Sequence, residues 1–421
     1  MIANMKIKKI SIERYKSIID PITLENFSNL QILVGPNNAG KTNILDAIHL
    51  FFDSLSDEER FSDKASEIGL VLDFEGKSRH LKYKNDQIIG DTGKISERFI
   101  RIGDSSSIYS LIPEKLKEFK EKHPREYELF SSALREYFKG VEISEKLFVS
   151  SVRADHGERP IKRMGEGFKR LFVILFYAFH PRYDIILIDE PEAHLHPSMI
   201  KRFLFILAEK KLQNQIFLTT HHPTFIQADY LKYVWRVARN ENGSTAVYGF
   251  PGPSADIDRL IQEINDDNSG MFFADKVLLV EGVSDHIFMR EIIKKFYKKT
   301  KDIKVVYAGG KGSIDIYAEL CGYFSIPCAI MMDRDALRSP SLQRVRGYPK
   351  ESEKMNGKEI IDALKKQEIF ILRQTLEDLF PKKYRKKETK PLTSLYVSRK
   401  MTEDDFKSKK MSPVGEILEI I

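Results

Sequence analysis

The sequence predicts an α/β protein built from two modules. Apolar strand-like runs alternate with helical runs over residues 147–219, and the same alternation returns over residues 276–332. Between them, residues 240–268 are rich in Gly, Pro, Asn, Asp and Ser, which is typical of a domain boundary. We therefore expect a first domain over residues 1–250, a linker over 251–270 and a smaller second domain over 271–421.

The composition excludes several classes of protein. A chain of 421 residues with 42% hydrophobic and 31% charged residues is neither a peptide hormone or toxin, nor disordered, nor collagen-like. Two cysteines are too few for a disulfide framework or a Cys-rich zinc site. The N-terminal residues lack the apolar core of a signal peptide, and no window approaches the roughly 18 apolar residues of a membrane span. We expect a cytoplasmic protein with no membrane contact.

The net charge is unevenly distributed along the chain. Residues 1–270 carry 38 Lys and Arg against 39 Asp and Glu, whereas residues 271–421 carry 30 against 22. The whole positive excess of the protein, a net +7, therefore lies in the C-terminal part. Such a field favours polyanions such as nucleic acid, and a lysine-rich solvated surface is the alternative.

The elements of the first module follow in order. Strands are expected over 6–12 and 31–34, a helix over 41–54, antiparallel strands between 68 and 102, a charged helical stretch over 113–139, strands over 147–152, 184–188 and 215–219, and helices over 167–179 and 198–210.

The second module has its own parallel sheet. Its expected strands cover 276–280, 304–307 and 327–332, and helices over 284–296 and 313–324 connect them. The later segment 381–390 is strongly basic. Its structure is not apparent from the sequence.

Residues 35–42 read Gly-Pro-Asn-Asn-Ala-Gly-Lys-Thr and match the phosphate-loop pattern between a strand and a helix. In this pattern backbone N–H groups surround the phosphates of a nucleotide, Lys41 reaches the terminal phosphates and the Thr42 hydroxyl binds magnesium. A flexible glycine turn is the alternative. The candidate ATP-binding residues here are Gly35, Asn37, Asn38, Ala39, Gly40, Lys41, Thr42 and Asn43.

The expected strand 184–188 leads into two adjacent carboxylates. Asp189 is placed to hold the magnesium of the nucleotide, and Glu190 to orient a water for attack on the γ-phosphate. His221 follows the next apolar strand, where a neutral imidazole could bind the γ-phosphate. A solvated acidic turn is the alternative interpretation of the acidic pair.

These motifs resemble the ABC-type ATPases, in particular the group with RecF, the SMC-like proteins and the OLD (overcoming lysogenization defect) family. The resemblance implies that a signature loop of one subunit closes the nucleotide site of another. The stretch 163–170 corresponds to that loop, with Gly165 and Gly167 as backbone donors to the phosphate. It departs from the family pattern because Gly165 stands where a serine is usual.

Four carboxylates of the second module follow two of its predicted strands. Glu281 and Asp285 come after the first strand, and Asp333 and Asp335 come after the third. Carboxylates gathered at one sheet edge repel each other, and a divalent cation removes that repulsion. Hard oxygen ligands favour Mg²⁺, with Mn²⁺ as an alternative, over zinc. Residues that cap strand-to-helix turns are the competing interpretation.

This pattern resembles a Toprim domain, a Rossmann-like α/β module of topoisomerases, primases and OLD nucleases. The resemblance implies that Glu281, Asp285, Asp333 and Asp335 hold a metal for phosphodiester cleavage. It also implies that Glu377 holds a second metal, and that Lys409 or Lys410 stabilises charge in the transition state. A glycine turn at residues 309–313 is expected to bring Lys311 to the same edge, and a purely structural turn is the alternative.

The order of the modules, an ABC-type P-loop ATPase domain followed by a Toprim domain, resembles the OLD family over nearly the whole chain. The resemblance implies an ATP-hydrolysing, metal-dependent endonuclease acting on DNA, most simply double-stranded, as a homodimer or larger assembly. A role in phage defence or DNA processing and a partner protein of a defence system are further implications. The alternatives are an ATP-switched, RecF-like DNA-binding or scaffold protein without cleavage activity, and a nuclease directed at RNA.

Overall fold

The computed structural model separates the chain into two compact units. Unit 1 comprises residues 1–226 and 230–249, and unit 2 comprises residues 227–229 and 250–421. In the part of the chain that the structure describes, no helix is both long and apolar enough to cross a membrane. The described residues are 5–52, 67–74, 77–84, 87–90, 98–103, 112–138, 141–144, 148–151, 159–210, 212–250, 264–265, 267–384 and 389–421.

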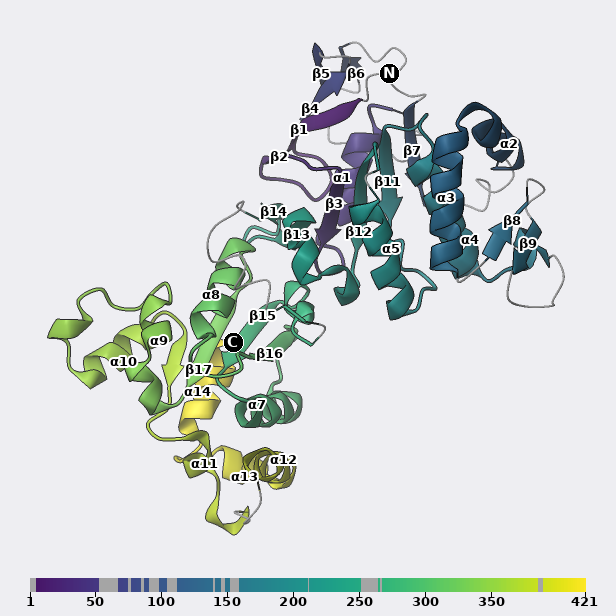
Figure 1. The fold of residues 1–421 in the computed structure, drawn as a ribbon. Helices are drawn as coiled ribbons and strands as arrows, with labels where there is room; N and C mark the ends of the chain where they lie inside the picture. The colour runs from purple at the N-terminus through teal and green to yellow at the C-terminus, as the bar shows by residue number, and fades with distance from the viewer. Residues whose placement is uncertain are drawn as a thin grey trace. The chain divides into compact units, whose positions relative to one another are not determined.

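A six-stranded sheet forms the centre of unit 1 (Figure 1). Its strand order is β14-β13-β3-β12-β11-β7, and all neighbouring pairs are parallel except β13 with β14. The buried strands are continuous apolar runs, as expected for a sheet covered on both faces. The strands are β3 Leu30–Val34, β7 Phe99–Ile102, β11 Ile185–Asp189, β12 Gln215–Thr220, β13 Val234–Arg239 and β14 Thr245–Gly249.

A second sheet of unit 1 is antiparallel, with the order β2-β1-β4-β5-β6. Antiparallel strands were expected over the whole of residues 68–102, and this is wrong for the last of them. β7 pairs in parallel with β11, because its apolar positions Phe99 and Ile102 are buried in the central sheet. The strands of the antiparallel sheet are β1 Lys6–Glu13, β2 Ile22–Glu25, β4 Glu67–Phe74, β5 Lys77–Lys84 and β6 Gln87–Ile89.

Helices cover the central sheet of unit 1. Helix α1, Lys41–His49, shares one apolar core with the antiparallel sheet and with strands β11 and β12. Helix α4, Glu166–Phe179, is buried along its length, and α3 packs on it. The remaining elements are α2 Ile112–Lys122, α3 Pro124–Tyr137 and α5 Pro197–Glu209, and a three-stranded sheet of β8 Val141–Ile143, β9 Phe148–Ser151 and β10 Arg159–Pro160.

The helical stretch expected over 113–139 is thus two helices, separated at His123. The expected helix over 41–54 ends at His49 and continues as a turn to Phe52, and residues 53–54 lie outside the described residues. Residues 147 and 152 of the expected strand 147–152 also lie outside them.

Unit 1 contains a buried histidine that makes its stability depend on pH. His180 follows α4 and stacks on Phe119 at a ring-centroid distance of 4.6 Å, and its Nδ1 accepts a hydrogen bond from the N–H of Arg182. Burial, and secondarily the neighbouring His123, lowers the pKa of His180 to about 4. The folded protein therefore holds this imidazole neutral at pH values where an unfolded chain protonates it.

Asp184, whose pKa burial raises to about 6, binds a proton more readily in the folded state and acts in the opposite sense. The contribution of His180 alone should lower the free energy of unfolding of unit 1 by about 3 kcal/mol as the pH decreases from 7 to 4. The sign follows because the unfolded state binds the proton near pH 6.5 whereas the folded state resists it. Urea unfolding followed by the fluorescence of Trp235, the single tryptophan of the chain, measures this. The difference between wild type and His180→Phe should therefore change by about 3 kcal/mol over this pH range, and the exposed His80→Phe should leave the pH dependence of wild type unchanged. Equal pH slopes in wild type and His180→Phe would contradict the assignment.

A four-stranded parallel sheet forms the core of unit 2, in the order β16-β15-β17-β18 (Figure 1). The strands are β15 Lys276–Val280, β16 Ile303–Tyr307, β17 Cys328–Met332 and β18 Ile369–Ile371. This confirms the parallel sheet expected for the second module. Helix α7, Val283–Phe296, connects β15 to β16, and α8, Ile314–Tyr323, connects β16 to β17.

The rest of unit 2 is helical. One core cluster joins α7 and the C-terminal helices to alternate sheet residues such as Leu278 and Val280. The segment between β17 and β18 carries α9 Pro340–Arg344 and α10 Gly357–Lys365. After β18 follow α11 Leu376–Leu379, α12 Lys390–Lys400, α13 Glu403–Phe406 and α14 Ser412–Ile420.

Candidate nucleotide and metal sites

The loop between β3 and α1 has the geometry of a phosphate cradle. Gly35 has φ 150°, and a Cβ placed on it would lie 2.0 Å from the carbonyl oxygen of Val237. Gly40, at φ 106°, directly precedes α1, and the Thr245 hydroxyl donates to the carbonyl oxygen of Ala39 over 2.8 Å. Both positions therefore need glycine, and the loop is held against β13 and β14.

The end of β11 brings the acidic residues to this loop. Oδ1 of Asp189 accepts a hydrogen bond from the Thr42 hydroxyl over 3.3 Å, and the hydroxyl of Thr219 also donates to it. The Arg170 guanidinium donates to the backbone oxygen of Asp189 over 2.6 Å and holds the strand end in place. Thr42 and Asp189 are thus adjacent, which is the arrangement that magnesium at a phosphate loop requires.

Glu190 lies between this pair and the end of β12. Its φ of 47° is in the left-handed region, which is strained for a non-glycine residue, and its N–H donates to the carbonyl oxygen of Thr219 over 3.1 Å. Its Oε1 lies 3.0 Å from Nδ1 of His221. The backbone N–H of His221 donates over 3.0 Å to Glu192, which the hydroxyl of Thr220 also contacts. The structure thus brings Glu190 and His221 together.

The Lys41 ammonium lies inside the loop and donates to the carbonyl oxygens of Gly35 and Pro36, each over 2.9 Å. Burial lowers the pKa of Lys41, and the carboxylates of Glu190, Glu192 and Asp189 oppose this shift. A bound polyphosphate would add negative charge beside this ammonium and favour its charged form. The charge of the loop therefore fits a nucleotide.

The other predicted loop positions lie on the same turn. Asn38 has φ 61°, and its carbonyl oxygen accepts from the Arg239 side chain over 3.0 Å, while the Asn43 amide donates to the Ser17 hydroxyl over 2.5 Å. Asn37 is exposed beside them.

The two glycines of the signature stretch differ in their surroundings. A Cβ on Gly167 would lie 2.6 Å from the carbonyl oxygen of His194, so this glycine permits close packing within its own subunit. Gly165 is the N-cap of α4, and no described heavy atom beyond its chain neighbours comes within 4 Å of a Cβ placed there. Gly165 is therefore the more accessible of the two.

The carboxylates of unit 2 gather where its parallel strands end. Glu281 follows β15, Asp333 follows β17, and Glu377 lies in α11 shortly after β18. Asp285, in the first turn of α7, accepts a hydrogen bond from the N–H of Gly282 over 3.0 Å. Asp333 accepts one from the N–H of Leu376 over 3.1 Å. The carboxyl ends of parallel strands meet at one sheet edge, which is where α/β proteins bind ligands.

The pKa values show that these groups lie within reach of each other's charge. Burial, followed by the charges of Asp285, Glu281 and Glu377, raises the pKa of Asp333 to about 7. Burial raises the pKa of Asp285 to about 6, with Glu377 and Glu281 contributing in the same direction. Burial also raises the pKa of Glu281, followed by the charge of Asp335. Mutual repulsion of this kind is what a divalent cation would relieve.

The donor set fits a hard divalent cation in its chemistry. Oε2 of Glu281 is buried and has no hydrogen-bond partner among the residues that the structure describes. Within those same residues, however, no three His, Cys, Asp or Glu side chains already converge as a metal cage. Metal binding here would therefore require the carboxylates to turn toward a common centre. Asp285 and Asp333 also have a structural role, because each accepts a backbone N–H at a strand-to-helix turn.

Two lysines border the carboxylates. Lys311, in the predicted glycine turn, lies 2.5 Å from Oδ2 of Asp335, and this ion pair lowers the pKa of Asp335. The expectation that the turn brings Lys311 to the carboxylate edge is confirmed. Lys390, at the start of α12, lies 3.3 Å from Glu377, and the charges of Glu377, Asp333 and Asp285 raise its pKa. The ammonium of Lys410 instead donates to the carbonyl oxygen of Phe380 over 3.0 Å.

Lys390 and Arg101 are the charged residues that sequence reasoning missed. Lys390 ends the basic segment 381–390, and its proximity to Glu377 depends on the packing of α12 against α7. Arg101 lies 3.7 Å from Asp189 and 2.7 Å from Asp46, and so connects β7 to the nucleotide site. The sequence pattern did not predict the contact of Arg101 with Asp189, because the strand that carries Arg101 was expected to belong to an antiparallel sheet.

Models of three protein families match this chain. An AAA ATPase domain matches residues 5–139, and an AAA domain described as putative AbiEii toxin, Type IV TA system, matches residues 104–227. A TOPRIM domain described as overcoming lysogenization defect protein-like matches residues 272–335. The predicted fold class, an ATPase domain followed by a smaller Toprim domain, is confirmed.

Two nucleases are among the relatives of this chain. An OLD nuclease from Thermus scotoductus is 24% identical over 238 residues, which are 52% of this chain and 45% of the relative. The Old nuclease of Escherichia phage P2 is 26% identical over 306 residues, 66% of this chain and 47% of the relative. OLD nucleases are therefore homologues of this protein, and the chain spans about half the length of these two relatives.

Two solved SMC head structures align with part of this chain. The SMC head domain from Thermotoga maritima aligns with a TM-score of 0.42 and 18% identity over 59% of this chain and all of that chain. An SMC head bound to the C-terminal winged-helix domain of ScpA aligns with a TM-score of 0.44 and 18% identity, over 57% of this chain and 96% of that chain.

Proposed function

We propose that this protein is an ATP-hydrolysing, divalent-metal-dependent endonuclease that cleaves DNA phosphodiesters. The single observation that carries the nuclease assignment is the group of carboxylates at the ends of β15, β17 and β18, whose pKa values rise through burial and mutual repulsion. A buried acidic cluster without such a task would be an unfavourable arrangement for folding. The homology to OLD nucleases supports the same assignment.

Within this proposal, Glu281, Asp285, Asp333 and Asp335 hold Mg²⁺ or Mn²⁺, and Glu377 contributes to a second metal position. When bound, the metal supplies an activated water and charge stabilisation for the phosphodiester. Lys390 holds Glu377 in place and provides positive charge beside the scissile phosphate. Lys311 forms an ion pair with Asp335 and provides a second positive charge beside the carboxylates.

Nucleotide binds at residues 35–43, with Lys41 on its terminal phosphates and Thr42 and Asp189 on its magnesium. Glu190 orients the attacking water, and His221 holds Glu190 through the contact between Nδ1 and Oε1. We further propose that a homodimer forms through the signature stretch, with Gly165 and Gly167 facing the nucleotide of the partner subunit. A role in phage defence is the setting that we infer for this activity.

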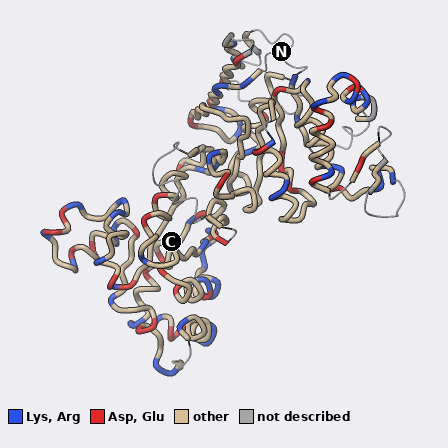
Figure 2. The backbone as a smooth tube through the Cα atoms, viewed as in Figure 1, with Lys and Arg blue, Asp and Glu red and all other residues tan. Residues whose placement is uncertain are grey.

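A basic face of unit 2 is suited to the phosphate backbone of nucleic acid. Helices α7 and α12 pack together, and Figure 2 shows lysine and arginine along both of them. Such a face supplies sequence-independent affinity that falls with salt. The exposed residues concerned are Lys294 and Lys295 of α7, Lys298 and Lys299 shortly after its end, and Arg399 and Lys400 of α12.

The test is cleavage of supercoiled plasmid by the 421-residue chain with Mg²⁺, with Mn²⁺ or with chelator, each with and without ATP. We expect nicked or linear product only with a divalent metal. A parallel reaction on single-stranded RNA decides between the two kinds of nucleic acid. Retarded but intact plasmid in every metal condition would instead support a RecF-like DNA-binding protein, and cleavage of RNA alone would exclude the DNA assignment.

A further inference from the structure

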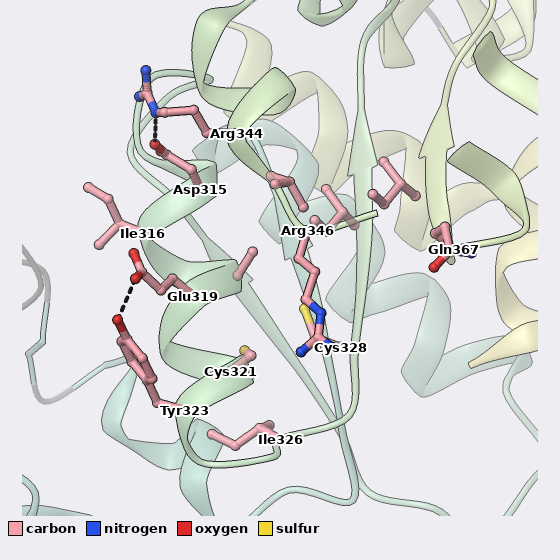
Figure 3. A pocket seen from close by; sticks show the side chains of 15 residues that line it. Asp315, Ile316, Glu319, Cys321, Tyr323, Ile326, Cys328, Arg344, Arg346 and Gln367 are labelled. Carbon is pink, nitrogen blue, oxygen red and sulfur yellow. Dashed lines mark hydrogen bonds and ion pairs between the residues drawn. The ribbon is translucent and has the colours of Figure 1, made fainter. Parts of the chain in front are cut away.

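A cavity of about 800 Å³ lies in unit 2 on the face of the sheet that α8 covers (Figure 3). Cys328 and Ile330 of β17 line it, whereas the alternate residues Ala329 and Met331 face the core cluster of α7 on the other side. Cys328 begins its strand, and Asp333 follows the end of the same strand. The cavity is thus a separate place from the carboxylate edge.

The floor of the cavity is apolar. Ile326, Ile330 and Ile369 contribute to it together with Cys321 and Cys328, and the Cys328 thiol donates to the carbonyl oxygen of Ala329 over 3.6 Å. The neighbouring thiol and burial together raise the pKa of Cys328, so this thiol stays neutral. A neutral thiol packs as a small apolar group, and this floor would therefore accept an apolar or aromatic ring system.

The acidic groups of the cavity wall already have partners. Asp315 accepts from Nε of Arg344 over 2.6 Å and from the Ser341 hydroxyl, and Glu319 accepts from the Tyr323 hydroxyl. Figure 3 shows two of these contacts as dashed lines, Arg344 with Asp315 and Tyr323 with Glu319. These carboxylates are therefore neutralised or hydrogen-bonded without a ligand.

Arg346 differs from these residues. Its side chain extends into the cavity toward Cys328 (Figure 3), and within the described part of the chain no hydrogen bond or ion pair engages its guanidinium. The Gln367 amide also lines the cavity. Arginine binds carboxylate, sulfonate and phosphate groups through two parallel hydrogen bonds. The guanidinium of Arg346 can therefore hold an anionic group beside this apolar floor.

We propose that this cavity binds a small organic anion with a flat apolar body, and that Arg346 holds the anionic group. The volume agrees with this class, because ligand pockets commonly measure about 300–1,000 Å³. The apolar floor takes the body of the ligand and Gln367 supplies a further polar contact. Such a ligand would bind to unit 2 independently of both the nucleotide and the nucleic acid.

Anilinonaphthalene sulfonate is a suitable probe, and phenylnaphthylamine has the same rings without the sulfonate. We expect the 421-residue chain to bind the sulfonate saturably with a dissociation constant on the order of tens of micromolar. The uncharged probe should bind at least about tenfold more weakly, since it lacks the charge-assisted hydrogen bonds. Probe fluorescence measures both affinities.

Three variants locate the binding. Arg346→Gln should weaken sulfonate binding about tenfold and Arg346→Lys much less. Gly322→Leu should reduce both probes, because Gly322 lines the cavity and a Cβ there meets no other atom within 4 Å, so the added side chain occupies cavity space without a clash. Arg290→Gln, on α7 and outside the cavity, is the matched control. Thermal melting establishes that each variant is folded.

The proposal is overturned if the protein binds no sulfonate probe, or if Arg346→Gln and Gly322→Leu both bind it as tightly as wild type. Equal affinity for the two probes in wild type would also overturn it, because Arg346 would then not recognise the anion.

Discussion

Asp333→Asn should reduce metal-dependent cleavage of plasmid by about 10³-fold or more, which corresponds to about 4 kcal/mol of lost transition-state stabilisation. Asp333 is the residue on which the carboxylate cluster centres, since Asp285, Glu281 and Glu377 all raise its pKa. Asparagine preserves the size of the side chain and removes one negative ligand from the metal. Initial rates of nicking at saturating Mg²⁺ and Mn²⁺ measure the effect.

The fold of unit 2 should survive this change. The amide oxygen of asparagine can still accept the N–H of Leu376, which Oδ1 of Asp333 accepts over 3.1 Å. Asp362→Asn, at an exposed position of α10, is the matched control and should cleave like wild type. ATP hydrolysis should be retained in both variants. If Asp333→Asn cleaves at the wild-type rate, the metal site proposed for these carboxylates is wrong.

Glu190→Gln should lower the rate of ATP hydrolysis by about 10²–10³-fold while leaving ATP binding intact. The glutamine keeps the shape of the side chain and its contact with His221, but it cannot accept a proton from the attacking water. Lys41→Ala, by contrast, should abolish binding itself, because Lys41 is the ammonium inside the phosphate loop. Steady-state phosphate release and binding of a fluorescent ATP analogue separate these two effects.

Glu209→Gln and Lys201→Ala, on exposed positions of α5, are the matched controls for these two substitutions. If Glu190→Gln hydrolyses ATP at the wild-type rate, Glu190 does not activate the attacking water. Measuring plasmid cleavage in Lys41→Ala then establishes whether nucleotide promotes or restrains the nuclease. A cleavage rate that is independent of ATP in wild type and unchanged in Lys41→Ala would show that the two activities are not coupled.

Local patterns in the chain were sufficient to predict most of the elements that position these sites. The apolar runs before Asp189, Glu281 and Asp333 are strands in the structure, and the phosphate loop lies between a strand and a helix as expected. These predictions succeeded because a buried parallel strand needs a continuous apolar run, and because the loop needs glycine at fixed positions. Both requirements are local, so they are visible in a short stretch of residues.

Contacts between residues distant in the chain were decided by packing. Phe99–Ile102 was expected to be antiparallel like the strands that precede it in the sequence, yet it pairs in parallel with β11 in the central sheet, and Arg101 consequently reaches Asp189. Lys390 approaches Glu377 because α12 packs on α7, and no spacing in the sequence encodes that distance. The cavity at Arg346 exists because α8 and the segment before β18 leave space on one sheet face.

Residue type and spacing along the chain thus determined the chemistry available at each site: a phosphate loop, an acidic strand end and a set of hard metal ligands. The fold alone decided which cation faces which carboxylate, because side-chain electrostatics acts over a few ångströms in space and is indifferent to separation in sequence. Lys311 beside Asp335 and Lys390 beside Glu377 show the two cases, the first anticipated from a local turn and the second produced by the packing of a distant helix.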